Sequence, residues 1–213
     1  MIFASTVNAW LAGRWAKPVL FGLALLPLAY LLSAAYLDQL GANPAEALVR
    51  KSGDWTLRML CIALLVTPLR QALHWPYVAR LRRMLGLFVF FYALLHFAAY
   101  AWLDQGADWA DISADIAKRP FIVVGVSALL LLAPLAATSF NAAQRWLGAA
   151  RWRALHRAVY LVAVLAVLHF FWMRAGKRNF TEVAVYASVL AALLAWRVRE
   201  ALRQRASRRA TSR

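Results

Sequence analysis

The chain is poor in the residues from which most soluble catalytic sites are built. Its 213 residues include one cysteine, Cys61, which excludes a disulfide framework and a cysteine metal site. It has no glycine-rich phosphate loop and no Ser, His and Asp arrangement typical of a hydrolase. No acidic residue lies within an apolar run, and Asp104 and Glu182 lie only at run ends, which weighs against an ion-coupled transporter.

Apolar sequence, by contrast, is abundant. The chain is 63% hydrophobic with a mean hydropathy of +0.58, too apolar for an ordinary soluble domain. Six runs have about the length that crosses a hydrocarbon core of about 30 Å; they cover residues 19–37, 55–73, 84–103, 121–138, 155–173 and 183–198. The sequence therefore predicts an all-α integral membrane protein with six transmembrane helices. We expect a cytoplasmic segment at 1–18, a transmembrane domain at 19–198 and a basic cytoplasmic tail at 199–213.

Basic residues gather on one side of this predicted topology. If the loops alternate, the side with both termini carries seventeen Lys and Arg and one acid, Glu200, whereas the other side carries eight residues of each sign. Because Lys and Arg mark cytoplasmic loops, we expect both termini in the cytoplasm. The net charge of +16 then reflects topology and attraction to lipid headgroups, and nucleic acid is not an expected partner. The longest external connection, 104–119, is acidic and is predicted as a loop that suits either a docking surface or plain solvation.

The first run also has features of a signal peptide. Arg14 and Lys17 precede it, and small residues follow from Ser33. The run is longer than a usual signal core, and removing it would upset the charge pattern. We therefore expect this helix to be retained.

Two of the four histidines lie deep within apolar runs. At 1.5 Å per residue, His96 lies about 18 Å and His169 about 21 Å from the cytoplasmic starts of the third and fifth runs. These runs point the same way, so both imidazoles share a depth toward the external face. A heme held by two histidines needs this arrangement, because each side of the iron takes one nitrogen. Hydrogen bonding between helices or a proton path is the alternative role.

His156 opens the fifth run at its cytoplasmic end, about 20 Å along the helix from His169. A second heme there would complete a route across the bilayer. On a straight helix, however, the two side chains lie about 140° apart. Arg153 and Arg157 flank His156 and favour an interfacial role. His74, at the end of the second run, matches His156 in depth but is also interfacial.

Short motifs along the chain resemble one known family in their order and spacing. They are residues 41–48 (GANPAEAL), 67–70 (TPLR), 82–86 (RRMLG), 92–96 (YALLH), 118–120 (KRP) and 134–139 (PLAATS), followed by Trp152, 155–157 (LHR), Tyr160 and 168–169 (LH). The family is MsrQ, also called YedZ, the heme-binding membrane subunit of the periplasmic methionine-sulfoxide reductase system. The resemblance covers most of the chain from the first helix into the fifth.

The resemblance implies a ferric-reductase-like bundle in the bacterial inner membrane that binds b-type heme. It also implies electron flow from the quinone pool to MsrP, a periplasmic molybdenum-cofactor reductase that repairs oxidised methionines. FMN is associated with the family, with a cytosolic flavin reductase as an alternative donor, but no residue here places the flavin. His96, His156 and His169 match the family's three histidines, and the first and third are the expected axial pair.

One position departs from the wider ferric-reductase superfamily. Its two-heme members carry two histidines on each of two helices, but thirteen residues before His96 the chain has Arg83. We therefore expect one heme and leave open a second at His156. The alternative functions are a stand-alone transmembrane metal reductase and a heme-free transporter or scaffold.

Overall fold

The computed structural model describes residues 2–175 and 179–211, and every regular element in them is helical. The elements are α1 (Ile2–Ala12), α2 (Ala16–Tyr36), α3 (Pro44–Ala72), the 3₁₀ helix η1 (Pro76–Leu81), α4 (Arg82–Ala99), the π-helical turn η2 (Tyr100–Asp104), α5 (Trp109–Lys118), α6 (Pro120–Ala137), α7 (Asn141–His156), α8 (Val159–Ala175) and α9 (Thr181–Thr211). The all-α prediction is confirmed for these residues.

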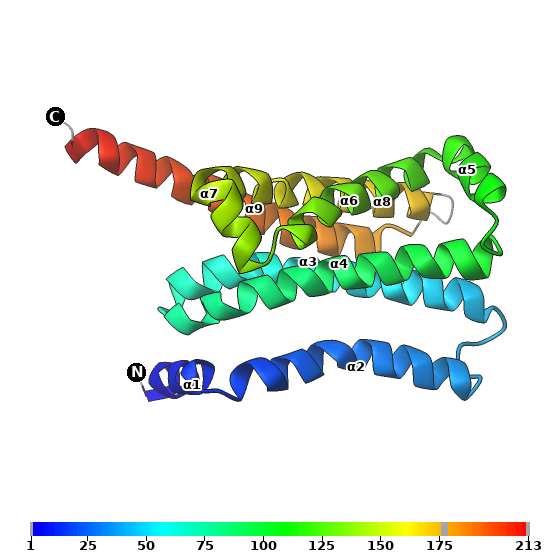
Figure 1. Cartoon of the computed structure of the whole chain (residues 1–213), viewed down its shortest axis with the longest axis horizontal. Coiled ribbons are helices and arrows are strands. Elements are labelled where there is room, and N and C mark those ends of the chain that lie inside the picture. Colours follow the sequence, from blue (N-terminus) through cyan, green and yellow to red (C-terminus); the bar gives the residue numbers. More distant parts are fainter. Residues whose placement is uncertain (1, 176–178, 212–213) are drawn as a thin grey trace.

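The long helices run side by side, with α3 and α4 in the middle of the bundle (Figure 1). Helices α6, α8 and α9 lie on one side of this pair, and α2 lies on the other. The closest partners are α3 with α4 and α6 with α8, and the two pairs meet where α4 contacts α6. Both chain ends lie at the same end of the bundle, and α5 lies at the opposite end. The interior between the two pairs is the natural place for a site.

Five helical segments are long and apolar enough to cross a membrane. They are Ala16–Tyr36, Pro76–Asp104, Pro120–Ala137, Asn141–Ala175 and Thr181–Ser207. Each covers one of the predicted runs to within one residue. The remaining run, 55–73, lies in α3, whose first half carries five charged residues, from Glu46 to Arg58, and which is therefore not among these segments. The chain is thus a multi-pass membrane protein with α3 packed inside the bundle.

Arg197 bonds a backbone carbonyl that a proline leaves free. Pro68 inside α3 has no N–H to offer the carbonyl of Leu64, one turn earlier. The guanidinium of Arg197 on α9 donates to that carbonyl at 2.6 Å. Such repair by a neighbouring helix is what makes proline tolerable within a membrane helix. It also joins α9 to α3 where the α3 hydrogen-bond ladder is interrupted.

The connection 104–119 is more ordered than the predicted loop, because it contains α5. The carboxylate of Asp108 caps this helix by accepting from the backbone N–H groups of Ala110 and Asp111. Ile112 on its inner face is buried with Tyr100, whose hydroxyl donates to Asp115 at 2.9 Å. The concentration of acids obscured this amphipathic pattern in the sequence.

The fifth predicted run is broken near its start. Helix α7 ends at His156 and α8 begins at Val159. The turn between them has hydrogen bonds of the 3₁₀ type, between residues three positions apart, such as that from the Ala158 N–H to the Leu155 carbonyl. His156 and His169 therefore lie on different helices, so the 140° angle expected from one straight helix does not apply. Helix α9 also extends through most of the predicted tail, to Thr211.

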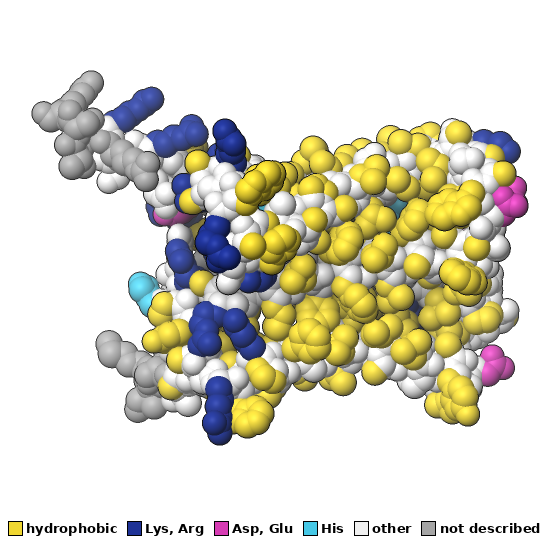
Figure 2. All heavy atoms as spheres, in the orientation of Figure 1, with side chains coloured by type: hydrophobic (Ala, Val, Ile, Leu, Met, Phe, Trp, Pro, Cys, Tyr) yellow, Lys and Arg dark blue, Asp and Glu magenta, His cyan; other side chains and the backbone are white. Residues whose placement is uncertain are grey.

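Charge is separated between the two ends of the bundle. Figure 2 shows Lys and Arg gathered at the end that holds both termini, a broad apolar belt around the middle, and Asp and Glu at the opposite end of this face. An apolar belt between polar ends is the surface expected of a protein that spans a bilayer.

Replacing Tyr92 with phenylalanine tests how α2 is held against the bundle. Tyr92 on α4 is fully buried, and its hydroxyl donates to the Ala24 carbonyl on α2 at 2.7 Å. We expect Tyr92→Phe to lower the free energy of unfolding by about 1 kcal/mol, measured by denaturant titration in detergent. Tyr30→Phe is the control, because Tyr30 is exposed and its hydroxyl accepts a hydrogen bond from Lys51 at the surface. Equal losses in both variants would contradict the assignment.

Candidate functional site

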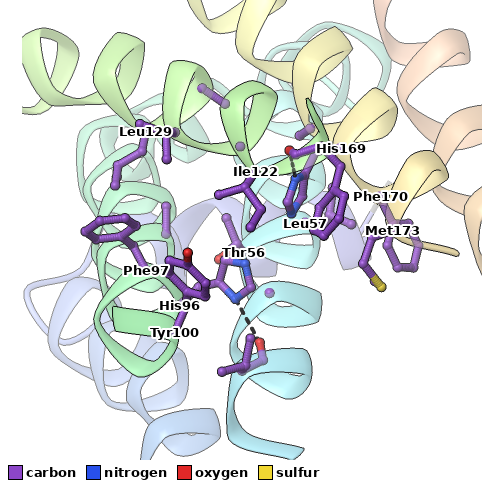
Figure 3. Close-up of a pocket in the computed structure, with 18 of the residues that line it drawn as sticks. Thr56, Leu57, His96, Phe97, Tyr100, Ile122, Leu129, His169, Phe170 and Met173 are labelled. Carbon is purple, nitrogen blue, oxygen red and sulfur yellow. Dashed lines mark hydrogen bonds between the residues drawn. The ribbon is translucent and has the colours of Figure 1, made fainter. Parts of the chain in front are cut away.

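A cavity of about 390 Å³ lies between α3, α4, α6 and α8, toward the end of the bundle away from the termini. Its walls are mostly apolar and include Leu57, Leu129 and Phe170 (Figure 3). Arg50 and Arg119, near the starts of α3 and α6, also line it. The volume falls in the range of about 300–1,000 Å³ that is typical of ligand and cofactor pockets.

His96 reaches this cavity from α4. Its Nδ1 bonds the backbone carbonyl of Val49 on α3 at 2.8 Å. A carbonyl oxygen can only accept, so Nδ1 carries the proton and Nε2 keeps its lone pair. Nε2 of His96 has no hydrogen-bond partner in the part of the chain that the structure describes. This is the state of a metal-binding histidine, in which the protein orients the ring through the other nitrogen.

His169 reaches the same cavity from α8 in the same way. Its Nδ1 bonds the carbonyl of Phe121 on α6 at 2.6 Å, drawn as a dashed line in Figure 3. The Phe121 ring also lies beside the imidazole, with 5.9 Å between ring centroids. Nε2 is again left without a hydrogen-bond partner among residues 2–175 and 179–211.

Each histidine ring rests on a glycine one turn after the carbonyl that it bonds. A Cβ on Gly53 would stand 3.1 Å from Cε1 of His96, and a Cβ on Gly125 would stand 2.8 Å from Nδ1 of His169. Helices α3 and α6 therefore present the same seat, a carbonyl at position i and a glycine at i+4. Sequence reasoning missed these glycines, although an isolated glycine in a helical pattern signals a packing role.

The two imidazoles lie close enough to share one metal ion. Their ring centroids are 6.1 Å apart. An imidazole nitrogen binds a metal at about 2.0 Å, so rings on opposite sides of one ion have centroids roughly 6 Å apart. The expectation that His96 and His169 share a depth is confirmed.

A bare metal ion is a poor match for this site. The described residues contain no group of three or more His, Cys, Asp or Glu that could hold one. Two histidines beside a large apolar cavity instead fit a metal whose remaining ligands come from its own organic ring, as in heme. The residues present therefore fit the cofactor that the sequence suggested.

His156 lies apart from this pair, as the last residue of α7 at the end of the bundle that holds the termini. Its Nδ1 bonds the Trp152 carbonyl at 3.1 Å, and its ring stacks on the Trp152 indole with 3.9 Å between centroids. Its Nε2 is buried and has no partner among the described residues. His74 is exposed and makes no described contact with His156, so the structure does not bring these two together.

Two arginines that line the cavity are each paired within their own helical turn. Arg50 bonds Glu46 at 2.6 Å, and Arg119 bonds Asp115 at 2.9 Å. In each ion pair the two residues are four positions apart in the sequence. Both pairs are partly exposed, so each contributes little to stability. The acidic residues Glu46, Asp54 and Asp104 also line the cavity, so its charged residues are of both signs.

Comparison with known proteins places this chain in a family. The family described as "Ferric reductase like transmembrane component" matches residues 52–167, which include His96 and His156. A relative from Polaromonas naphthalenivorans (strain CJ2) is 63% identical over 89% of this chain and 90% of its own length. It is named protein-methionine-sulfoxide reductase heme-binding subunit MsrQ. The chain belongs to the MsrQ family.

Other MsrQ relatives are similar over nearly as much of the chain. The protein from Herminiimonas arsenicoxydans is 50% identical over 85% of this chain and 84% of its own length. The protein from Bordetella pertussis is 48% identical over 97% of this chain and 99% of its own length. Both carry the same MsrQ name. No solved structure has significant similarity to this chain.

Proposed function

We propose that this chain is a b-type cytochrome subunit that binds one heme between His96 and His169. It would pass electrons from quinol to the periplasmic reductase MsrP, which reduces methionine sulfoxide in proteins. The observation that carries this proposal is the pair of imidazoles, 6.1 Å apart, whose Nδ1 atoms are both held by backbone carbonyls. The MsrQ relatives are named heme-binding subunits, which supports it.

In this proposal Nε2 of His96 and Nε2 of His169 would hold the heme iron. Heme would supply a one-electron couple, which suits electron transfer. The carbonyls of Val49 and Phe121 fix the orientation of the rings and raise the basicity of the ligating nitrogens. The apolar walls limit access of water to the site.

Two of the charged residues that line the cavity would suit the carboxylates of a heme. Arg50 and Arg119 line the same cavity as the histidines, and each would exchange its present partner, Glu46 or Asp115, for a heme carboxylate. His156 has no second protein ligand among the described residues, so we propose a single heme and an interfacial role for His156.

Met173 and Tyr100 also line the cavity of His96 and His169, which places this cavity near the acidic end of the bundle.

We place α3 as the sixth transmembrane helix and both termini in the cytoplasm of the bacterial inner membrane. Helix α3 packs along the whole of α4 in spite of its charged first half, and the basic end of the bundle matches the charge rule for cytoplasmic loops. The His96 and His169 pair then lies near the periplasm. The acidic connection that contains α5 would face MsrP, and a cytosolic flavin reductase would meet the basic end as an alternative donor. FMN is proposed as a second cofactor of the chain on the family resemblance alone, with no site assigned.

Reporter fusions test this topology. We expect green fluorescent protein fused after Arg213 to fluoresce, because it folds in the cytoplasm, and alkaline phosphatase fused at Gly106 to be active, because it folds in the periplasm. Three spans separate these two reporters whether or not α3 crosses the membrane, so a third fusion tests α3 itself: alkaline phosphatase at Gly41, between α2 and α3, should be active if α3 spans the bilayer and inactive if it does not. The measurement is whole-cell fluorescence and phosphatase activity at matched expression.

Reconstitution tests the function. Purified protein in nanodiscs is reduced with a quinol analogue, and oxidation of the reduced absorption band is followed after addition of MsrP with methionine sulfoxide. We expect rapid oxidation only when both are present. Rapid oxidation by a ferric chelate, with no effect of MsrP, would favour a stand-alone metal reductase, which the ferric-reductase-like match also allows. A colourless protein after expression with ample heme would favour a transporter or scaffold.

A further inference from the structure

Ser52 on α3 is a buried polar residue next to the seat of His96. Apart from tyrosines, it is the one polar side chain that is buried in the part of the chain that the structure describes, with 1% of its surface exposed. Its hydroxyl lies 2.7 Å from the Leu48 carbonyl and 2.9 Å from the Val49 carbonyl. The Val49 carbonyl is the one that orients His96. Ser52 therefore bonds the same acceptor as the histidine ring.

The Val49 carbonyl has more donors than it can serve. His96 Nδ1 lies 2.8 Å from it and Ser52 Oγ lies 2.9 Å from it, and the helical ladder of α3 adds the N–H of Gly53. A carbonyl oxygen has two lone pairs, so each donor weakens the bonds of the others. Ser52 is the donor with an alternative acceptor, the Leu48 carbonyl.

A serine within a helix commonly bonds a carbonyl three or four residues earlier, and such a bond by itself is only local. Ser127 on α6 is an example, with 2.8 Å between its Oγ and the Val123 carbonyl. That carbonyl is two residues away from Phe121, which orients His169. Ser52 differs because one of its two acceptors also bonds a histidine of the cavity. Ser127 is therefore a matched helical serine without this coupling.

The seats of the two histidines differ three residues after the carbonyl. In α3 that residue is a serine, whereas in α6, where the carbonyl belongs to Phe121, it is Val124, which has no hydroxyl. Competition for the carbonyl should therefore lengthen the bond of His96 and leave the bond of His169 short. The distances follow this order, with 2.8 Å for His96 and 2.6 Å for His169.

We propose that Ser52 is a positioning residue that raises the midpoint potential of the site by competing with His96 for the Val49 carbonyl. A strong bond from Nδ1–H to a carbonyl gives the imidazole partial negative charge, and an electron-rich ligand stabilises the oxidised state of a metal. A hydroxyl that occupies part of the same acceptor weakens this effect and favours the reduced state. This role rests on the proposed binding of heme by His96.

Redox titration of the full-length, heme-loaded protein tests this role, with the heme absorption band as the readout. Ser52→Ala removes the hydroxyl and should lower the ratio of reduced to oxidised heme about threefold at a fixed ambient potential. A tenfold change would correspond to about 59 mV for a one-electron couple. Val124→Thr adds a hydroxyl to the seat of His169 and should raise the ratio by a similar factor. Ser127→Ala should leave it unchanged.

The ring proton of His96 provides a second readout that does not require heme. The chain has four histidines, so nuclear magnetic resonance of histidine-labelled protein gives few signals, and that of His96 is the one absent from His96→Gln. Ser52→Ala should move this Nδ1–H signal downfield, because its bond to the Val49 carbonyl becomes stronger. Ser127→Ala should not move it. If the protein proves to hold no heme, the proposed function fails, and this signal still decides whether Ser52 competes with His96.

An unmoved His96 signal together with an unchanged ratio in Ser52→Ala would overturn the proposal. Equal changes in Ser52→Ala and Ser127→Ala, or a higher ratio of reduced to oxidised heme in Ser52→Ala, would also overturn it. If Ser52→Ala does not fold, Val124→Thr decides, because it adds the competing hydroxyl in place of removing it. An unchanged or lower ratio in Val124→Thr would then refute competition at the carbonyl.

Discussion

His96→Ala and His169→Ala should each leave the purified protein with less than about one-tenth of the wild-type heme. Each variant removes one of the two imidazoles that meet across the cavity, and no other described histidine lies near enough to replace it. A single axial ligand in a half-open apolar cavity holds a porphyrin far less firmly than two. The measurement is quantified heme per protein together with the reduced-minus-oxidised absorption spectrum.

His156→Ala is the matched control for these two variants. It removes an imidazole of the same chemistry from the other end of the bundle, where it stacks on Trp152. With one heme per protein, its spectrum and heme content should equal those of the wild type. A fall to half would instead establish a second heme at His156. Full heme retention in both His96→Ala and His169→Ala would rule out the proposed axial pair.

Gly125→Ala should lower heme retention by about tenfold without unfolding the bundle. The added Cβ would stand 2.8 Å from Nδ1 of His169, so the ring must move away from the Phe121 carbonyl that orients it. Loss of such an outer hydrogen bond typically costs about 10–100-fold in metal affinity. Heme content after purification and the midpoint potential of the remaining heme both report the change.

Two other glycines calibrate this effect. Gly53→Ala should act in the same direction but less strongly, because its Cβ would stand 3.1 Å from the His96 ring. Gly86 lies on α4, the helix of His96, and a Cβ there meets nothing within 4 Å. Gly86→Ala should keep the heme and, by improving helix propensity, gain up to about 1 kcal/mol in stability. If Gly125→Ala keeps both heme content and midpoint potential, the glycine seat does not hold His169.

The histidine pair could be predicted from the sequence because depth in a membrane helix follows from counting. A helix rises 1.5 Å per residue and the bilayer sets where it begins, so His96 and His169 had to lie at similar depths. Rotation about the helix axis is different, because it depends on packing. Only the fold turns both rings into one cavity and leaves His156 at the opposite end on a separate helix.

The features that hold the histidines were not predictable in the same way. Val49 and Phe121 contribute backbone carbonyls, which every residue has, so no side chain signals their role. Gly53 and Gly125 are informative only when the ring that rests on each is known. The sequence did not predict helix α5, because its capping residue Asp108 lies among other acidic residues, and their concentration indicated a solvated loop.

The sequence by itself determined that this protein is helical, multi-pass and charged mainly at one end, and that two of its histidines share a depth. Those properties follow from hydropathy, length and the positions of Lys and Arg, which act locally along the chain. The tertiary structure alone decided which helices face one another. It set the 6.1 Å spacing of His96 and His169 and brought Arg197 to the carbonyl that Pro68 leaves free. Both depend on contacts between residues far apart in sequence, whose geometry arises only when the helices pack.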